Sequence, residues 1–252
     1  MIIRKGGFGL KESFYRTAML LGEDALKTLS NAHAAVFGVG GVGGHACDAL
    51  CRCGVGRLTI VDCAVVKESN LNRQICAEKS TIGLKKVEAM ARHIRAVSDA
   101  FVCPVDAFVT ADNAAALVPD DASVVIDAVD NVTAKLALIT YCVGKGIPVI
   151  SSMGAGNRLD PTRVKIGDIY KTSVDPLSRV MRRELKARGI KRLTVAWSDE
   201  EPTEPVFSAP DPDSVKPSPG STPFVPAAFG LALASEAVKI ILKKDDTNNE
   251  KI

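Results

Sequence analysis

Apolar residues recur along the chain with two different periods, and segments of the two kinds follow one another in turn. Short apolar runs of strand length are separated by amphipathic stretches of helix length from residue 11 to residue 151. Strands that alternate with helices form a mainly parallel sheet covered on both faces, so the pattern predicts an α/β fold with a doubly wound sheet. The predicted strands are His33–Gly38, Arg57–Asp62, 101–107, 123–127 and 147–151. The predicted helices are Lys11–Leu29, a segment that ends near Cys53, Gly83–Val97, 112–118 and 132–145.

The alternation changes after Gly156, where we expect an irregular C-terminal extension. Two further predicted strands, Arg163–Ile169 and Arg192–Trp197, flank a predicted helix at Pro176–Arg188. Residues 199–226 are rich in Pro, Ser and Asp, which predicts a long exposed loop. A loop of this length inside a compact domain is typical of a functional flap or of a disordered segment, and the sequence leaves both open.

The most apolar segment, Phe224–Leu242, is long enough to cross a membrane. It carries Glu236 and Lys239, which favours a closing helix of the protein core and no membrane partner. The polar residues 243–252 predict a frayed tail. The first residues lack the long apolar core of a secretory signal, so we expect a cytoplasmic protein.

The composition indicates the general class of protein but does not indicate a function. Apolar residues make up 46% of the chain and charged residues 24%, the balance of an ordinary soluble globular protein. The net charge of +3 is too small to indicate a nucleic-acid binder by itself, so that reading depends on local clusters of charge.

A glycine-rich turn follows the first predicted strand. Gly38, Gly40 and Gly43 form a G-x-G-x-x-G motif between a strand and a helix, with Gly41 inside it. Glycines at these places let the backbone approach a phosphate closely, and the helix N-terminus offers unpaired N–H groups to an anion. Asp62 ends the next strand, where a ribose-binding carboxylate is expected. These features predict an adenine nucleotide, with NAD as the default ligand.

Three further features favour a triphosphate over NAD. The loop Ser69–Gln74 carries Arg73, and Lys86 lies at the start of the next predicted helix, so two cations converge near the phosphate turn. Asp130 follows a sheet strand at the edge where ligands bind in open α/β sheets. A carboxylate beside a triphosphate disfavours binding unless it holds Mg²⁺. The cofactors expected from the residues are therefore ATP and Mg²⁺.

At this point the chain resembles a known family. The segments GVGGVGG, VDCAVVKESNLNRQ, GLKKVEAM and IDAVDN are similar to those of the ubiquitin-activating-enzyme-like (HesA/MoeB/ThiF) superfamily, over roughly residues 14–155. The resemblance implies that Asp62 binds ribose, that Arg73 and Lys86 bind phosphates and that Asp130 holds Mg²⁺. It also implies a homodimer in which Arg16 reaches into the partner's site. The nucleotide-binding set implied by these motifs is Gly38, Gly40, Gly41, Gly43, Asp62, Asn70, Arg73, Gln74 and Lys86, and the catalytic set is Arg16, Arg73, Lys86 and Asp130.

Cysteines decide between branches of the superfamily. The seven cysteines include no CxxC pair, and none lies in residues 143–252. Transfer of an activated carrier protein to a local thioester would therefore have no nucleophile there. The stretch SSMGAGNRLDPTRVKIGDIYKTSVDPLSRVMRRELKARGIK resembles the tRNA threonylcarbamoyladenosine dehydratase branch, as does WSDEEP after it. That resemblance implies ATP-dependent activation of a carboxylate on a modified adenosine beside the tRNA anticodon, followed by ring closure in a form that the sequence leaves open.

A basic run in the second half agrees with a tRNA substrate. Cations dominate residues 179–192, where Glu184 is the single acid. Cations that contact phosphates are what tRNA binding requires. The predicted tRNA-binding residues are Arg179, Arg182, Arg183, Lys186 and Arg188, and the alternative is a solvated helix face.

The leading hypothesis is thus a ligase-type adenylating enzyme that dehydrates threonylcarbamoyladenosine in tRNA. An alternative is an adenylyltransferase for a ubiquitin-like sulfur-carrier protein, with a cysteine desulfurase system as partner. A third is a non-catalytic module that senses a nucleotide. We expect a single adenylation domain over residues 1–242, composed of a nucleotide-binding core at about 30–155, a substrate or crossover region at about 156–226 and a closing helix at 227–242, before the tail at 243–252.

Overall fold

The computed structural model describes residues 10–207 and 219–249, the last six of them for their backbone alone. Its centre is a seven-stranded sheet in the order β3-β2-β1-β4-β5-β7-β6, parallel except for β6, which pairs antiparallel with β7 at one edge. The doubly wound, mainly parallel sheet predicted from the pattern is therefore confirmed. The strands are β1 His33–Phe37, β2 Arg57–Val61, β3 Phe101–Val105, β4 Val124–Asp127, β5 Val149–Ser152, β6 Val164–Asp168 and β7 Thr194–Ser198.

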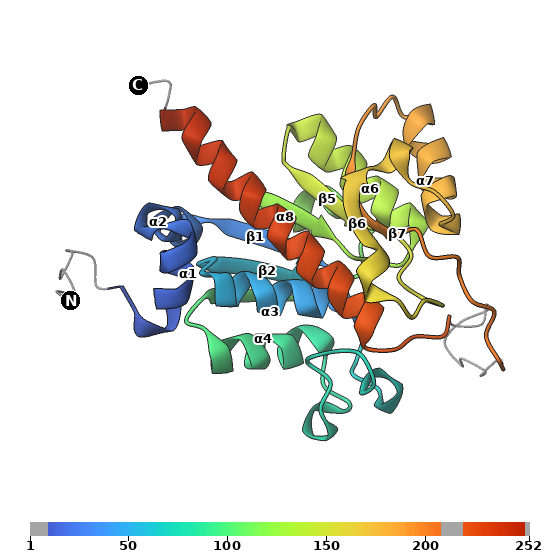
Figure 1. Cartoon of the computed structure of the whole chain (residues 1–252), viewed down its shortest axis with the longest axis horizontal. Helices are drawn as coiled ribbons and strands as arrows, with labels where there is room; N and C mark the ends of the chain where they lie inside the picture. The colour runs from blue at the N-terminus through green and yellow to red at the C-terminus, as the bar shows by residue number, and fades with distance from the viewer. Residues whose placement is uncertain (1–9, 208–218, 250–252) are drawn as a thin grey trace.

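Helices cover both faces of the sheet (Figure 1). On one face α2, α3, α4 and α8 enclose the largest apolar cluster, and on the other face α5 and α6 enclose a second. A third cluster joins α6 and α7 beside β7. The helices are α1 Tyr15–Leu21, α2 Glu23–Asn31, α3 Gly43–Cys53, α4 Lys86–Val97, α5 Ala114–Leu117, α6 Val132–Lys145, α7 Pro176–Ala187 and α8 Phe224–Asn249.

The first helix differs from its prediction. Periodicity alone predicts one helix from Lys11 to Leu29, whereas the structure has a 3₁₀ turn at Glu12–Phe14 and two helices separated by Gly22. Gly22 has φ +86°, a conformation that ends a helix and that glycine adopts without steric cost. The helix predicted from Gly83 likewise begins later, at Lys86, because Gly83 has φ +88°.

The closing helix α8 crosses the sheet and packs on α3 (Figure 1). Its segment Phe224–Lys243 is apolar and long enough to span a membrane by length and composition. Val225, Phe229 and Leu233 on this segment are fully buried against the sheet and α3, so the helix is part of the core. The backbone stays helical to Asn249, so most of the predicted frayed tail is helical, and residues 250–252 lie outside the described part.

The predicted irregular extension contributes to the main sheet. After β5 the chain forms β6, then α7, then β7, which inserts between β5 and β6. The loop predicted at 199–226 has no helix or strand at 199–207 and 219–223, and residues 208–218 lie outside the described part.

Candidate functional site

A cavity of about 1010 Å³ opens at the carboxyl ends of β1, β2 and β4. Ligands bind at this edge of doubly wound sheets, where helix N-termini and strand-end loops converge. Of the ten residues that the sequence assigned to the nucleotide or the metal, nine line this cavity. They are Gly38, Gly40, Gly41, Asp62, Asn70, Arg73, Gln74, Lys86 and Asp130.

The tenth residue, Gly43, does not line the cavity but packs against the backbone of the glycine-rich turn. A Cβ atom at Gly43 would lie 1.8 Å from the carbonyl oxygen of Gly38. Gly38 itself has φ +85°, and a Cβ there would lie 2.5 Å from the carbonyl oxygen of Ala128. Gly40 has open space where its Cβ would be. The turn is thus tightly packed at two glycines and open toward the cavity at a third, which suits a backbone that approaches a phosphate.

Asp62 fixes the loop after β2 to the glycine-rich turn. Its Oδ2 accepts a hydrogen bond from the Val39 N–H at 2.7 Å, and its Oδ1 accepts one from the Ala64 N–H at 2.8 Å. The carboxylate is half-buried and still borders the cavity. It is therefore held in place before any ligand binds, as a ribose-binding carboxylate would have to be.

The loop Ser69–Gln74 supplies a cation and two amides. Asn70 is buried, and its Oδ1 accepts a hydrogen bond from the Lys67 N–H. Arg73 donates from Nη1 to Ser69 O at 3.0 Å and to Asn72 Oδ1 at 2.8 Å. Burial lowers the pKa of the Arg73 guanidinium below its ordinary value, which still leaves it cationic at neutral pH. The Oε1 atom of Gln74 is buried and has no hydrogen-bond partner within the described chain.

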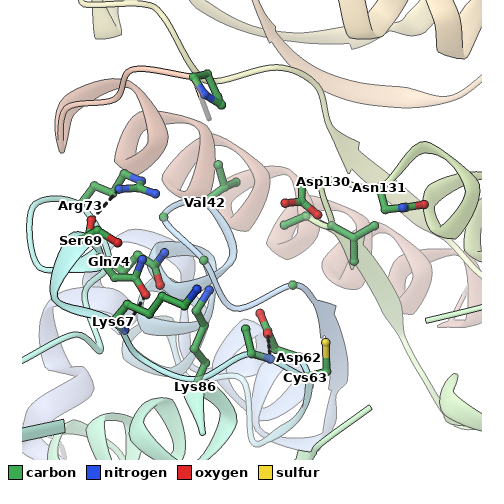
Figure 2. A pocket seen from close by; sticks show the side chains of 18 of the residues that line it. Val42, Asp62, Cys63, Lys67, Ser69, Arg73, Gln74, Lys86, Asp130 and Asn131 are labelled. Carbon is green, nitrogen blue, oxygen red and sulfur yellow. Dashed lines mark hydrogen bonds between the residues drawn. The ribbon is translucent and has the colours of Figure 1, made fainter. Parts of the chain in front are cut away.

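Two lysines extend the positive charge along the cavity. Lys86, the first residue of α4, is half-buried, and Lys67 lies in the same strand-to-helix connection. In Figure 2 both side chains reach toward the same part of the cavity, below Arg73. Lys67 was missed by sequence reasoning, although it lies only two residues before the Ser69–Gln74 motif. Three cations at one wall make this side of the cavity suited to several phosphate groups.

Asp130 lies across the cavity from these cations (Figure 2). Its side chain is exposed and makes no hydrogen bond or ion pair with another described residue. The described residues contain no group of three or more His, Cys, Asp and Glu side chains placed to hold a metal. One free carboxylate beside a polyphosphate fits Mg²⁺, which binds through one or two carboxylates together with phosphate oxygens and waters.

The long loop after β7 borders the same cavity. Pro205, Val206 and Phe207 line it from one end of the loop, and Pro219 and Gly220 from the other. Both ends are hydrogen-bonded to Asn157, whose N–H donates to Gly220 O at 2.7 Å and whose carbonyl accepts from Thr203 N–H at 2.8 Å. Asn157 has φ +59°, a left-handed conformation that asparagine tolerates better than most residues. The two described ends of the loop are therefore attached beside the mouth of the cavity.

Arg16 is absent from the cavity lining of its own chain. It lies on α1, at the end of the sheet opposite the carboxyl ends of the strands (Figure 1). Its side chain is exposed and makes no hydrogen bond or ion pair to another described residue. The same helix exposes Met19 and Leu20 at 87% and 84% of their surface.

The predicted tRNA-binding residues lie on and just after α7, where the structure divides them into two groups. Arg182 donates from Nη1 to the carbonyl oxygen of Thr172 at 3.0 Å and also bonds its hydroxyl. Arg183 and Arg188 both pair with Glu184, and these hydrogen bonds lower the pKa of that carboxyl. Two members, Arg179 and Lys186, are exposed and make no side-chain hydrogen bond or ion pair within the described chain.

All seven cysteines are free thiols. Burial raises the pKa of Cys51 and Cys76 to about 11 and that of Cys142 to about 12, which keeps these thiols protonated at neutral pH. Cys63 is exposed and borders the cavity beside Asp62. Burial of part of its side chain also raises the Cys63 pKa, so the residue is not poised as a nucleophile.

Comparison with known proteins shows the family of this chain. The chain matches the ThiF family over residues 14–252. The tRNA threonylcarbamoyladenosine dehydratase of Bacillus subtilis is 39% identical over 240 residues, which cover 91% of this chain and 94% of that protein. The protein of the same name from Escherichia coli is 44% identical over 178 residues, covering 70% of this chain and 66% of that protein. The solved structure of E. coli tRNA N6-threonylcarbamoyladenosine dehydratase, TcdA, in complex with ATP gives a TM-score of 0.84 at 38% identity, covering 93% of this chain and 96% of that chain. The superfamily resemblance drawn from the motifs is thereby confirmed, and this chain belongs to the ThiF family.

Proposed function

We propose that this protein is an ATP-dependent tRNA threonylcarbamoyladenosine dehydratase. The observation that carries the proposal is a single cavity in which a phosphate-binding turn and three cations face one free carboxylate. Such a cavity suits a nucleotide triphosphate with its metal, and a dinucleotide would leave the cations unmatched. Relatives of that name at 39% and 44% identity give the substrate class.

The reaction has two steps, both within reach of one cavity. An oxygen of the threonyl carboxylate attacks the α-phosphorus of ATP, the bond from that phosphorus to the bridging oxygen breaks, and pyrophosphate leaves with the bonding electrons. A carbonyl oxygen or nitrogen of the same modification then attacks the activated carbonyl carbon, and AMP leaves with the former carboxylate oxygen. The substrate loses the elements of one water, and the nucleophile's proton passes to solvent.

The chain's own groups supply the electrostatics of the first step. Arg73, Lys86 and Lys67 offset the negative charge that builds on the leaving pyrophosphate. The glycine-rich turn and the N-terminus of α3 hold the phosphates through backbone N–H groups. Asp130 would hold Mg²⁺, which supplies charge neutralisation between phosphate oxygens when bound. Asp62 would accept hydrogen bonds from the ribose hydroxyls and so fix the nucleoside end of ATP.

We further propose that the enzyme is a homodimer and that Arg16 serves the partner's cavity. Two features support this arrangement. Arg16 does not line the cavity of its own chain, and the adjoining Met19 and Leu20 form an exposed apolar surface on one short helix. Exposed apolar patches on a soluble domain are typical of contacts between subunits.

We propose that tRNA contacts the exposed cations of α7. Arg179 and Lys186 are available to phosphates without breaking a contact within the described chain, whereas Arg182 is bonded to Thr172. The N-terminal cap of α7, Asp175, is also bonded to Gly154 and Arg158, and Arg158 donates to the carbonyl oxygen of Glu200 in the loop after β7. A tRNA on α7 would thus lie beside the mouth of the cavity.

A sulfur-carrier adenylyltransferase remains the second candidate from the sequence, with a cysteine desulfurase system as its partner. The sequence has no cysteine at 143–252 to form a local thioester, so this candidate would need the partner to supply the thiol. Cytoplasmic location and the lack of a membrane partner stay predictions.

The test compares pyrophosphate release with three substrates at equal concentration. We expect release with tRNA that carries threonylcarbamoyladenosine, and none above background with the same tRNA lacking the modification or with a ubiquitin-like carrier. Equal release from both tRNAs, or release driven by a carrier's free C-terminus alone, would contradict the proposal.

A further inference from the structure

Two opposite charges are completely buried beneath the loop that carries Asp130. Asp127 ends β4, Lys135 lies in the first turns of α6, and both side chains are 0% exposed. Lys135 Nζ lies 3.0 Å from Asp127 Oδ2. Removing two charges from water costs several kcal/mol for each ion, and a well-packed apolar pair often stabilises a core at least as well. Packing alone therefore does not account for this pair.

The pair holds the backbone on both sides of Val129. The Val129 N–H donates to Asp127 Oδ1 at 3.3 Å, and Lys135 Nζ donates to the Val129 carbonyl oxygen at 3.0 Å. Ser151 on the neighbouring strand β5 donates to Asp127 Oδ2 at 2.6 Å, which fixes the carboxylate itself. The residue that follows Val129 is Asp130, so these bonds determine where the Asp130 backbone emerges into the cavity.

The same segment forms the wall against which the glycine-rich turn packs. A Cβ atom at Gly38 would lie 2.5 Å from Ala128 O and 2.9 Å from Val129 N. The Ala128 N–H also donates to Phe37 O at the end of β1, at 2.8 Å. The phosphate-binding turn and the Asp130 loop are therefore in direct contact, and the buried pair lies behind that contact.

We propose that Lys135 and Asp127 are positioning residues that set the place of the Asp130 carboxylate relative to the nucleotide phosphates. Mg²⁺ requires near-ideal octahedral geometry with ligands at about 2.1 Å, so a carboxylate that shares the ion with phosphate oxygens has to be placed closely. The pair acts through the two peptide groups that flank Val129 and does not touch the ligand. This inference rests on the proposed function for the identity of the ligand, a magnesium–nucleotide complex.

The test measures the binding of ATP to the full-length protein by calorimetry, once with Mg²⁺ and once with EDTA. The ratio of the two affinities reports the metal contribution without any turnover. We expect a large ratio for the unmodified protein and a ratio near one for Asp130→Ala. Lys135→Met should lower the ratio by about tenfold, a coupling of about 1.4 kcal/mol, while affinity in EDTA stays within about twofold.

A double-mutant cycle separates positioning from general destabilisation. If Lys135 acts through Asp130, Lys135→Met adds no further loss to the ratio of Asp130→Ala. Because Lys135→Met leaves Asp127 buried and uncompensated, its fold is checked by thermal unfolding. The neutral pair Asp127→Asn with Lys135→Met removes that uncompensated charge. We expect it to recover the melting temperature but not the magnesium effect, because the Val129 carbonyl has still lost its donor.

His33→Leu is the matched control. His33 is 3% exposed and lies at the amino-terminal end of β1, away from the carboxyl ends of the strands, where it hydrogen-bonds Thr59 Oγ1 at 2.8 Å. It should lower the melting temperature and leave the magnesium ratio unchanged. A normal ratio in folded Lys135→Met, with Asp130→Ala still defective, would overturn the positioning role alone. If the ATP affinity of the unmodified protein is the same with Mg²⁺ and with EDTA, both this inference and the metal role of Asp130 are overturned.

Discussion

Three glycine-to-alanine variants separate the two tasks of glycine in this fold, close packing and close approach to a ligand. In Gly43→Ala the new Cβ would lie 1.8 Å from Gly38 O, at least 1.2 Å inside the 3.0 Å below which real Cβ contacts essentially never fall. In Gly56→Ala it would lie 1.9 Å from Ser30 O, an equal clash in a turn outside the cavity. In Gly40→Ala nothing lies within 4 Å, so the methyl group projects into free space at the cavity.

The magnitudes follow from these contacts. A clash with backbone that has to move costs about 3 kcal/mol, so Gly43→Ala and Gly56→Ala should each lower the melting temperature by about 6–12 °C. Gly40→Ala should change it by less than about 2 °C, because its Cβ meets nothing. For ATP, displacement of the turn removes about two charge-assisted hydrogen bonds from backbone N–H groups, each contributing about 1.5 kcal/mol. Gly43→Ala should therefore weaken ATP binding by about 100-fold. In Gly40→Ala the turn stays in place, but the new methyl group occupies the space through which a phosphate would approach the backbone, so we expect a loss of similar size.

The assay pairs thermal unfolding with calorimetric titration of ATP at a temperature where all three variants are folded. Gly56→Ala serves as the control for destabilisation, because it should bind ATP within about twofold of the unmodified protein. Folded Gly43→Ala that binds ATP normally would refute the assignment of this turn as the phosphate site. Equal loss of ATP binding in Gly56→Ala would show that instability alone explains the effect.

The remaining predictions address the dimer, the tRNA surface and occupancy of the cavity. The inactive variants Arg16→Ala and Asp130→Ala should regain activity together when their subunits exchange, because some sites in the mixed dimers keep both residues. If no activity returns after proven exchange, Arg16 acts in the site of its own subunit or in none. The double variant Arg179→Glu with Lys186→Glu should raise the Michaelis constant for tRNA and leave the affinity for ATP nearly unchanged. If the Michaelis constant for tRNA is unchanged at two salt concentrations, α7 is not part of the tRNA-binding surface. Cys63 should be the first thiol alkylated in the native protein, and because its pKa is raised, the rate should keep rising at pH values above the ordinary pKa of a cysteine. Saturating ATP should slow the alkylation, since Cys63 borders the cavity. A rate that does not change with ATP would mean that the nucleotide binds elsewhere.

The sequence predicted those site residues whose place follows from their position next to a predicted strand or helix. The glycine-rich turn, Asp62 and Asp130 each lie at or just after the end of a predicted strand, and Lys86 lies near the start of a predicted helix. In a parallel sheet the carboxyl ends of strands share one edge, so position along the chain was enough to bring them together. The family motifs then gave them roles that spacing alone left open.

The rest of the site depends on tertiary contacts that no local pattern reports. Lys135 reads in the sequence as an ordinary helix cation, yet it is fully buried against Asp127 because α6 packs that face on the sheet. Phe207 belongs to a polar loop and borders the cavity only because Asn157 ties both ends of that loop beside it. The break at Gly22 was missed because the amphipathic period continues across it, and one glycine's φ decided the outcome.

The central claim is that this protein uses ATP to remove water from a modified adenosine in tRNA, and mass analysis of the tRNA nucleosides tests it most directly. The tRNA bearing threonylcarbamoyladenosine is incubated with enzyme, ATP and Mg²⁺, then digested and separated. The account predicts that the nucleoside is converted to a product lighter by one water, with AMP formed in equal amount, and that Asp130→Ala forms neither. An unchanged nucleoside mass, with ATP consumed or not, would contradict the claim.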